Sequence, residues 1–330
     1  MNAERPLISV VTANYNGARH LREAIESVLG QSVADLELIV SDDASTDGSV
    51  AIVRRAARSD PRVRLVEGRS RSGPGAARNR ALCAARGRWI AVFDGDDLMA
   101  VGRLAQLVAK AEAHRAEIVA DNLLAFEDGE AGAERPFLAG REFEQPRWIT
   151  LAEVVGSSRM YSRRPGLGYL KPLISADALR RVRVRYDERL RIGEDYEFLI
   201  RLMANGLKLR FEPAALYRYR RHAGSTSGAM RREHLESMLT ADAAFEGDFP
   251  TLPGPVRRAL AARRASLERA LVYDHVVAAL KSHDLASAVR TALPHPGVWP
   301  MMAMPIEARL KRLAAGRRLG RRAAVRQALA

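Results

Sequence analysis

Strand-like and helix-like segments alternate along the first 125 residues of this 330-residue chain. In residues 20–31, for example, apolar side chains recur at spacings of three, four and seven positions, which places them on one helical face. Strands that are joined by helical crossovers run parallel, and helices cover both faces of their sheet. The pattern therefore predicts an α/β fold with a parallel sheet and helices on both faces. The expected strands are 7–13, 36–45, 62–68, 88–97 and 117–126, and the expected helices are 20–31, 45–58, 74–87 and 102–114.

Polar residues gather where three of these strands end. Residues 14–16 follow the first strand, residues 42–43 close the second, and residues 94–97 close the fourth. Ligands of open α/β sheets bind beyond the carboxyl ends of the strands. We therefore expect the functional site at this edge of the sheet.

The stretch Ala-Val-Phe-Asp-Gly-Asp-Asp at residues 91–97 has three carboxylates in four positions. Like charges repel one another, and a buried carboxylate without a partner is costly, so the stretch indicates a bound cation. Mg²⁺ and Mn²⁺ suit carboxylate and phosphate oxygens. The turn after the first strand, TANYNGARH, has neither the glycine pattern of dinucleotide-binding folds nor a P-loop. Any bound phosphates are therefore not held by a glycine-rich loop.

Beyond residue 126 the pattern becomes less regular. A loop-rich segment is followed by a helix that opens at Gly193 and closes at Gly206, then by a strand, a turn and a second strand, and finally by Ala-, Arg- and Leu-rich helices. These segments are expected at 127–165, 190–206, 207–222 and from 229 onward. We expect a domain over 1–225, with a donor half at 1–125 and an acceptor half at 126–225, and a helical, basic extension over 226–330.

Five stretches, in order and at the right separations, resemble family 2 glycosyltransferases of the nucleotide-diphospho-sugar transferase (GT-A) fold. They are SVVTANYNG, IVSDDASTDGS, GPGAARNRAL, GRWIAVFDGDD and RIGEDYEFLIRL. The resemblance covers residues 7–225. The stretch GYLKPLISADALRRVRVRYDERLRIGEDYEF, with ADNL, is similar to succinoglycan-type exopolysaccharide glucosyltransferases. The resemblance implies a Rossmann-like mixed sheet flanked by helices and an inverting, metal-dependent hexosyltransferase that uses a UDP-sugar, with UDP-glucose as the donor suggested by analogy.

The same resemblance implies roles for the residues at the strand ends. Asp97 would coordinate Mg²⁺ or Mn²⁺, Asp96 would contact the donor ribose or the surroundings of the metal, and His222 would complete the metal ligands or touch the diphosphate. Tyr15 and the backbone near Ala13 would stack against uracil and form hydrogen bonds with it.

Two further residues are expected to recognise the nucleotide. Asp43 would accept a hydrogen bond from uracil N3–H, which favours uracil because cytosine has no proton on N3. Arg78 would reach a uracil carbonyl or a phosphate. Asp42 and Asp47 are expected to be turn and cap residues instead.

The resemblance assigns the general base to Asp195 of the GEDYEF stretch. Its place in the first turn of a helix agrees, because the helix dipole favours an ionised carboxylate there. We expect Glu194, Tyr169 and Lys171 to contribute to the acceptor site, which would include residues 157–172.

The formal net charge is +14, and residues 301–330 hold eight Arg and Lys side chains against one acid, Glu307. Basic segments bind nucleic acid or anionic lipid head groups. We expect this tail, together with residues 295–305, to rest on the inner face of the cytoplasmic membrane and to meet a lipid-linked oligosaccharide acceptor there. The protein would thus be cytoplasmic and peripheral to the membrane. No stretch of about 18 apolar residues and no signal peptide is evident.

Two other functions remain as alternatives. A sugar nucleotidyltransferase would share the fold, but it would need a glycine-rich, basic turn after the first strand, and TANYNGARH is not such a turn. A nucleic-acid-binding protein would interleave aromatic with basic residues, and the tail has no aromatic residue, so no nucleic acid is expected. The single cysteine, Cys83, rules out an internal disulfide and is expected to be a small core residue.

Overall fold

The computed structural model describes residues 5–129, 134–162, 165–222, 224 and 230–302. The chain forms two compact units, Met1–Arg264 and Ala265–Ala330. The compact units divide after Arg264, farther along the chain than the domain boundary expected after residue 225. That boundary stays a prediction about functional domains.

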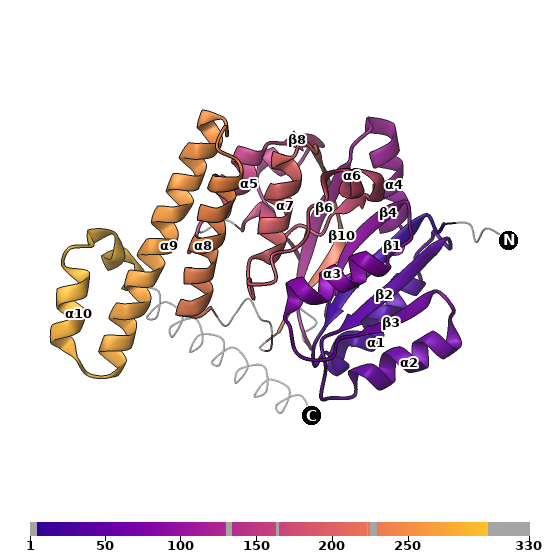
Figure 1. Cartoon of the computed structure of the whole chain (residues 1–330), viewed down its shortest axis with the longest axis horizontal. Coiled ribbons are helices and arrows are strands. Elements are labelled where there is room, and N and C mark those ends of the chain that lie inside the picture. The colour runs from indigo at the N-terminus through magenta and orange to yellow at the C-terminus, as the bar shows by residue number, and fades with distance from the viewer. Residues whose placement is uncertain (1–4, 130–133, 163–164, 223, 225–229, 303–330) are drawn as a thin grey trace, which may run out of the picture. The chain divides into compact units, whose positions relative to one another are not determined.

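The first unit is built on one mixed sheet, whose strands run through its middle in Figure 1. The parallel half of the sheet has the order β3-β2-β1-β4. Ala13 near the end of the first strand lies between Ser41 and Asp94 of its two neighbours. The strands are β1 (Ile8–Asn14), β2 (Leu36–Asp42), β3 (Val63–Glu67) and β4 (Trp89–Asp94).

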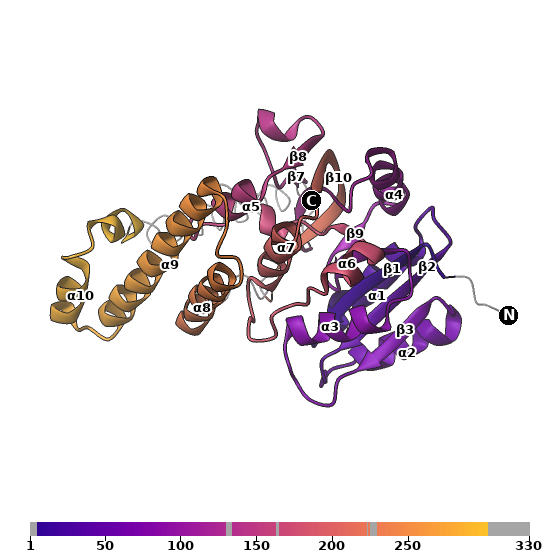
Figure 2. The ribbon, with the colours of Figure 1, turned by 45° about the horizontal axis from the view of Figure 1, so that its top comes forward.

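Helices cover both faces of this half, as the alternation predicted. Helices α1 (Ala18–Leu29) and α2 (Ser49–Ser59) carry the chain from β1 through β2 to β3, and α3 (Pro74–Ala84) carries it back to β4. The chain moves across the sheet in one direction from β1 to β3 and in the other direction from β3 to β4. Because such crossovers are right-handed, this change of direction places α3 on the opposite face from α1 and α2. Figure 2 shows α3 lying across β1 and β2, against which it packs. The prediction of a buried Cys83 is wrong, because this residue lies on the exposed side of α3.

The other half of the sheet is not parallel throughout. Strand β9 (Leu173–Ser175) lies between β4 and β6 (Ile118–Glu127) and is antiparallel to both. The chain reaches β9 after the loop-rich segment, so no helical crossover imposes a parallel direction. The five strands predicted from the alternation still run in one direction, because β9 is antiparallel to both β4 and β6 and lies outside the alternating segment. The mixed sheet implied by the family resemblance is confirmed.

A single strand, β10 (Leu209–Arg221), replaces the expected strand, turn and second strand. It pairs with β6 along most of its length, and its register shifts between Glu212 and Tyr217. Pro213 has no N–H to donate to the ladder, so the irregularity lies where proline is tolerated. What the sequence indicated as a turn is a bulge within one strand.

The remaining elements of the first unit complete the sheet edges and the helical layers. Two of them matter for the site, namely α7, which begins at Glu194, and the short 3₁₀ helix η2, which packs against it. The full set is β5 (Leu98–Met99), α4 (Arg103–His114), β7 (Arg135–Pro136), η1 (Arg141–Phe143), β8 (Arg147–Ile149), α5 (Leu151–Ser157), η2 (Leu167–Tyr169), α6 (Ala176–Val182), α7 (Glu194–Ala204), α8 (Arg232–Asp248) and the start of α9 (Gly254–Lys281).

The described part of the second unit is residues 265–302. It comprises the end of α9, then α10 (Leu285–Ala292) and the 3₁₀ helix η4 (Pro296–Met302). Its own small core consists of Val276, Ala279, Ala288, Ala292 and Val298. Among the residues that the structure describes, no helix is both long enough and apolar enough to cross a membrane. Most of the basic tail, residues 303–330, lies outside the described residues.

Candidate active site

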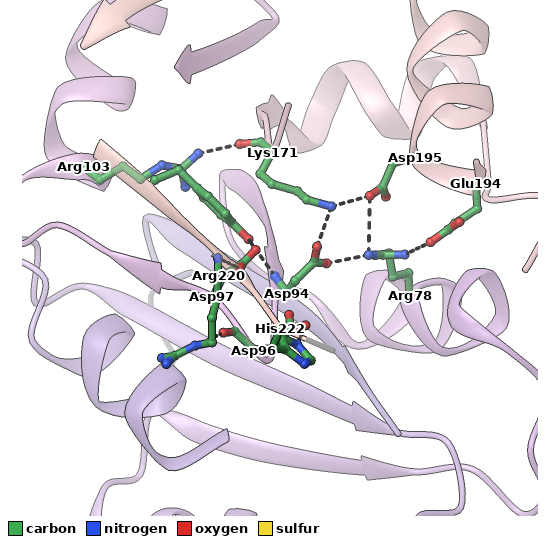
Figure 3. Close-up of polar contacts among 11 residues, drawn as sticks. Arg78, Asp94, Asp96, Asp97, Arg103, Lys171, Glu194, Asp195, Arg220 and His222 are labelled. Atoms are coloured by element: carbon green, nitrogen blue, oxygen red, sulfur yellow. Dashed lines mark hydrogen bonds and ion pairs between the residues drawn. The ribbon is translucent and has the colours of Figure 1, made fainter. Parts of the chain in front are cut away.

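Three carboxylates lie together at the carboxyl end of β4. Asp94 is the last residue of the strand, and Asp96 and Asp97 lie in the turn that leads to β5. One carboxylate oxygen of each residue lies within 4.8 Å of those of the other two. Figure 3 shows this acid cluster next to a second group of charged side chains from α3 and α7. The gathering of acids predicted from the sequence is present.

Asp97 is the most deeply buried of the three acids, with 1% of its surface exposed. Its Oδ2 accepts a hydrogen bond from the Tyr217 hydroxyl at 2.6 Å, and its Oδ1 accepts one from the Arg220 backbone N–H at 2.7 Å. Burial and the neighbouring carboxylates of Asp96 and Asp94 raise the pKa of Asp97 well above its usual value, despite these two hydrogen bonds. A cation bound here would stabilise the ionised carboxylate.

His222 lies beside Asp96, with its Nε2 atom 3.0 Å from Oδ2. Just before it in the chain, the buried Arg220 donates from Nε to the Asp96 backbone oxygen at 2.7 Å. The other guanidinium nitrogens of Arg220 pair with Asp128 at 2.8 Å and with Glu23 at 2.6 Å. This network ties the end of β10 to the acidic turn and so brings His222 to it.

The donor atoms at this turn fit a divalent cation. Asp96 and Asp97 offer carboxylate oxygens and His222 offers an imidazole nitrogen, a set that suits Mn²⁺ and Mg²⁺. The clustering and burial of the acids favour such an ion, because Asp97 is buried and the described groups that donate to its carboxylate, a hydroxyl and a backbone N–H, are both uncharged. Metal binding by Asp97 and His222 stays a prediction.

Asp94 has a different environment, because both of its oxygens are paired with cations of the protein. Its Oδ1 accepts from Arg78 Nη2 at 2.6 Å, and its Oδ2 lies 2.6 Å from Lys171 Nζ. Burial acts to raise the pKa of Asp94, but Lys171 and Arg78 outweigh it and hold the pKa below the ordinary range. Asp94 is therefore less suited to a metal than its two neighbours.

The same two cations join Asp94 to the start of α7, as Figure 3 shows. Lys171 Nζ lies 2.5 Å from Asp195 Oδ2, and Arg78 Nη1 lies 2.6 Å from Glu194 Oε1. Burial alone would lower the pKa of Lys171, but the carboxylates of Asp195 and Asp94 raise it well above its usual value. Burial raises the pKa of Glu194, and Arg78 opposes this effect.

Asp195 lies at the start of α7, beside Lys171 and Arg78. It is the second residue of α7, directly after Glu194, and the helix begins after Gly193, whose φ of +89° is in the region that favours glycine. Its Oδ2 contacts Lys171, whereas its Oδ1 is buried and has no hydrogen-bond partner among the residues described by the structure. The role of Asp195 as the general base stays a prediction.

A buried ion pair that the sequence did not reveal contacts the backbone of Lys171. Arg103 is fully buried, pairs with Asp121 at 2.8 Å, and donates from Nη2 to the Lys171 backbone oxygen at 2.5 Å. Asp121, which follows three apolar residues at the start of strand β6, was the available signal, because a buried carboxylate requires a cationic partner. Tyr217 and Arg220 were missed as well, and their only signal was their closeness in sequence to His222.

The residues expected to bind the nucleotide lie at the ends of β1 and β2. Tyr15 is 39% exposed, and the Arg71 guanidinium lies 4.2 Å from the centre of its ring. Asp43 is buried and accepts from the backbone N–H groups of Ser72 and Gly73 and from Arg80. The roles of Ala13, Tyr15 and Asp43 toward uracil stay predictions.

Two acids near this edge have the local roles that were expected of them. Asp42 accepts from Asn14 and from the backbone and hydroxyl of Ser45. Asp47 accepts from the N–H groups of Ala18 and Ser49, at the starts of α1 and α2. Both therefore act as turn and cap residues.

Of the residues expected at the acceptor site, only Tyr169 is open to solvent, with 41% of its surface exposed. Its ring lies 5.3 Å from that of Phe137 and 6.5 Å from that of Tyr219. Lys171 and Glu194 are buried and engaged in ion pairs. Arg78, expected at the nucleotide, is likewise buried among Asp94, Glu194 and Asp195.

Replacing Lys171 with Met is expected to destabilise the fold by about 3–5 kcal/mol, because Arg78 would face one buried and two partly buried carboxylates alone. The depressed pKa of Asp94 means that its ion pairs stabilise the fold above the ordinary carboxyl pKa, and that this stability is lost as the pH falls through the lower folded value. Without Lys171 the pKa of Asp94 moves back toward its ordinary value, so the variant loses less stability than the wild type as the pH falls. Urea unfolding from about pH 7 down to about pH 3 measures both effects.

Lys110→Met is the matched control for this measurement. Lys110 is 47% exposed and lies 3.7 Å from Glu212, so its removal should cost at most about 1 kcal/mol. Equal unfolding midpoints for the two variants across this pH range would contradict the importance assigned to the Lys171 ion pairs.

Comparisons with known proteins agree with this geometry. A model of the family described as Glycosyl transferase family 2 matches residues 9–165. The chain is 39% identical over 311 residues to the succinoglycan biosynthesis protein ExoO of Rhizobium meliloti (strain 1021), and the match covers 94% of this chain and 88% of that protein.

Two solved structures have a similar fold. The crystal structure of S. aureus TarS 1-349 in complex with UDP-GlcNAc has a TM-score of 0.62 at 16% identity and covers 88% of this chain and 91% of that one. The mannosyltransferase PcManGT from Pyrobaculum calidifontis in complex with GDP-Man and Mn²⁺ has a TM-score of 0.57 at 23% identity, with 94% and 88% covered. The 39% identity to ExoO over nearly the whole chain, with the family match that begins in β1, shows that this chain belongs to glycosyltransferase family 2 and has the GT-A fold.

Proposed function

We propose that this glycosyltransferase moves a sugar, glucose from UDP-glucose, with inversion onto a lipid-linked oligosaccharide in exopolysaccharide biosynthesis. The observation that carries the proposal is the way Lys171 and Arg78 hold the acidic turn after β4 next to Asp195. The name of ExoO supports exopolysaccharide biosynthesis, and the UDP-GlcNAc complex of TarS supports a UDP-sugar donor.

The donor would bind across the ends of β1, β2 and β4. Its uracil would stack on the half-exposed Tyr15, hydrogen-bond to the backbone near Ala13 and donate N3–H to Asp43. Asp96 would contact the ribose or the surroundings of the metal. The guanidinium of Arg78 already pairs with carboxylates. We therefore assign Arg78 the role of fixing the positions of Asp94 and Glu194, and not a contact with uracil.

A divalent cation, Mg²⁺ or Mn²⁺, would be held by Asp97, Asp96 and His222. Bound there, it supplies a Lewis acid that stabilises the negative charge developing on the leaving diphosphate. The protein's own contribution is to keep these ligands in place. Tyr217 and the Arg220 backbone orient the carboxylate of Asp97, and the Arg220 side chain holds the turn at Asp96.

Asp195 would act as the general base. The acceptor oxygen bonds to the anomeric carbon, the bond from that carbon to the diphosphate oxygen breaks, its electron pair leaves with UDP, and the hydroxyl proton passes to Asp195. Lys171 donates to Oδ2 of Asp195 and so fixes the orientation of the carboxylate. We therefore propose that Lys171 and Glu194 orient the acceptor site through their buried ion pairs and do not touch the acceptor, whereas Tyr169 contacts the acceptor sugar.

The acceptor would reach the enzyme at the inner face of the cytoplasmic membrane. The basic residues that follow position 301 would attract anionic head groups, and no nucleic acid is expected as a partner. In this proposal the enzyme is a cytoplasmic protein held peripherally on the membrane.

A panel of UDP-, GDP- and TDP-sugars, each assayed with and without EDTA and with membrane extract as acceptor, tests the proposed reaction. We expect transfer from UDP-glucose that stops with EDTA and returns with Mn²⁺ or Mg²⁺. Transfer from a GDP- or TDP-sugar alone, or undiminished transfer in EDTA, would overturn the proposed donor or the proposed metal respectively.

A further inference from the structure

An exposed apolar stripe runs along α10 in the second unit. Leu285 and Val289 of α10 and the helical C-cap residue Leu293 recur at every fourth position, which places them on one side of the helix. They are 65%, 54% and 71% exposed, which are large fractions for aliphatic side chains. We call these three residues the α10 stripe.

The stripe is separate from the side of α10 that packs into the protein. Ala288 and Ala292 face the small core of the second unit and are 3% and 2% exposed. Arg290, which is exposed, follows Val289 on the same helix. In the next segment, Trp299 of η4 is 50% exposed although its neighbour Val298 is fully buried. The second unit therefore has enough apolar contacts to hold α10 and still presents Leu, Val and Trp side chains to solvent.

We propose that the α10 stripe inserts into the interfacial region of an anionic lipid membrane and anchors the enzyme to it. This inference rests on the peripheral membrane location in the proposed function, and it names the apolar element that such a location needs. Aliphatic residues, an exposed Trp and nearby basic residues are the features of helices that lie in a membrane interface.

The charge of the chain favours a lipid surface as the occupant. Residues 301–330, which begin next to Trp299 in sequence, carry a formal charge of +7 of the +14 for the whole protein. Stable membrane binding needs two weak contributions, and an apolar insertion combined with a basic segment supplies them. An anionic lipid satisfies both, because its phosphate meets the basic residues and its acyl chains meet the stripe.

The size of the stripe argues against a protein partner. Helix α10 has eight residues and is therefore about 12 Å long. A stable protein interface buries about 800 Å² on each side and about 20–30 residues, which is far more than three side chains of one short helix provide. Self-association through the stripe, with a second copy of this chain, is the alternative that the experiments below test.

Vesicle flotation of the full chain tests the inference. The probe is a set of vesicles of phosphatidylcholine with and without phosphatidylglycerol, and the variant combines Leu285→Ser, Val289→Ser and Leu293→Ser. We expect the wild-type protein to float with the anionic vesicles and the triple variant to partition at least about tenfold more weakly, since each substitution removes an aliphatic side chain from the lipid. The single variants Leu285→Ser and Leu293→Ser should each show part of this loss.

The matched control combines Val101→Ser and Trp148→Ser, which remove exposed apolar side chains of the first unit. It should float as the wild-type protein does, and circular dichroism should show that all variants are folded. If the triple variant floats as well as the wild type, the α10 stripe is not the anchor, although the membrane location stands. If the wild type does not float, the membrane location itself fails.

Two further measurements distinguish membrane insertion from self-association and from a damaged donor site. Light scattering should give the same mass for the wild type and the triple variant, and a loss of mass in the variant would assign the stripe to self-association instead. Calorimetric binding of UDP with Mn²⁺ should be the same for both proteins. Absence of such binding in both would refute the proposed donor chemistry while leaving the flotation result to decide the anchor.

Discussion

Replacing Asp97 with Ala is expected to lower sugar transfer roughly a thousandfold and to abolish metal-assisted binding of UDP. Asp97 is held by the Tyr217 hydroxyl and the Arg220 backbone, so its carboxylate has one fixed position in the acidic turn. Ala removes that carboxylate and with it the proposed main ligand of the cation. Calorimetric titration of UDP in the presence and absence of Mn²⁺ measures the binding, and release of UDP measures the transfer.

Asp248→Ala is the control for loss of a carboxylate elsewhere. Asp248 is the last residue of α8, is 58% exposed and pairs with Arg201, so its removal should leave both measurements unchanged. A folded Asp97→Ala protein that still binds UDP more tightly with Mn²⁺ than without it would show that the metal is held by other residues.

Replacing Asp195 with Asn is expected to lower kcat by about 10²–10⁴-fold while leaving the binding of UDP with Mn²⁺ nearly intact. Asn has the same shape but cannot take the proton of the attacking hydroxyl. The residue lies on α7 and not in the acidic turn, so the proposed metal ligands are unchanged. Single-turnover transfer together with calorimetry separates the two effects.

Asp177→Asn provides the matched control, because Asp177 is also an acid in the first turn of a helix, α6, but is 84% exposed there. We expect it to have wild-type activity. An Asp195→Asn enzyme with normal kcat would refute the assignment of the base, whereas loss of UDP binding in this variant would mean that Asp195 supports the donor site.

Much of the parallel half of the fold was predictable because local patterns decide it. The apolar runs and helical periodicities from residue 7 to residue 126 correspond to β1, α1, β2, α2, β3, α3, β4, α4 and β6. Parallel strands share one carboxyl edge, so the same patterns predicted that the acids after β4 would lie near residues 14–16 and 42–43.

The features that the sequence missed or predicted wrongly depended on contacts between distant segments. The direction of the three-residue strand β9 follows from where the loop-rich segment returns, and no periodicity encodes that. The residues of β10 contain Pro213, a local turn signal, but pairing with β6 on both sides of the bulge outweighs it. Cys83 was expected in the core from its residue type, and only the packing of α3 shows that it faces outward.

The sequence by itself therefore determined the class of fold, the family and the presence of acids at one sheet edge, since periodicity and motif spacing are local properties of the chain. Only the tertiary structure decided how these acids divide. Asp94 is paired by Lys171 and Arg78, whereas Asp97 accepts only from the uncharged Tyr217 hydroxyl and the backbone N–H of Arg220 among the described residues. The physical reason is that the charge balance of a buried carboxylate depends on which side chains the fold brings within a few ångströms of it, and those side chains come from positions far apart in the sequence.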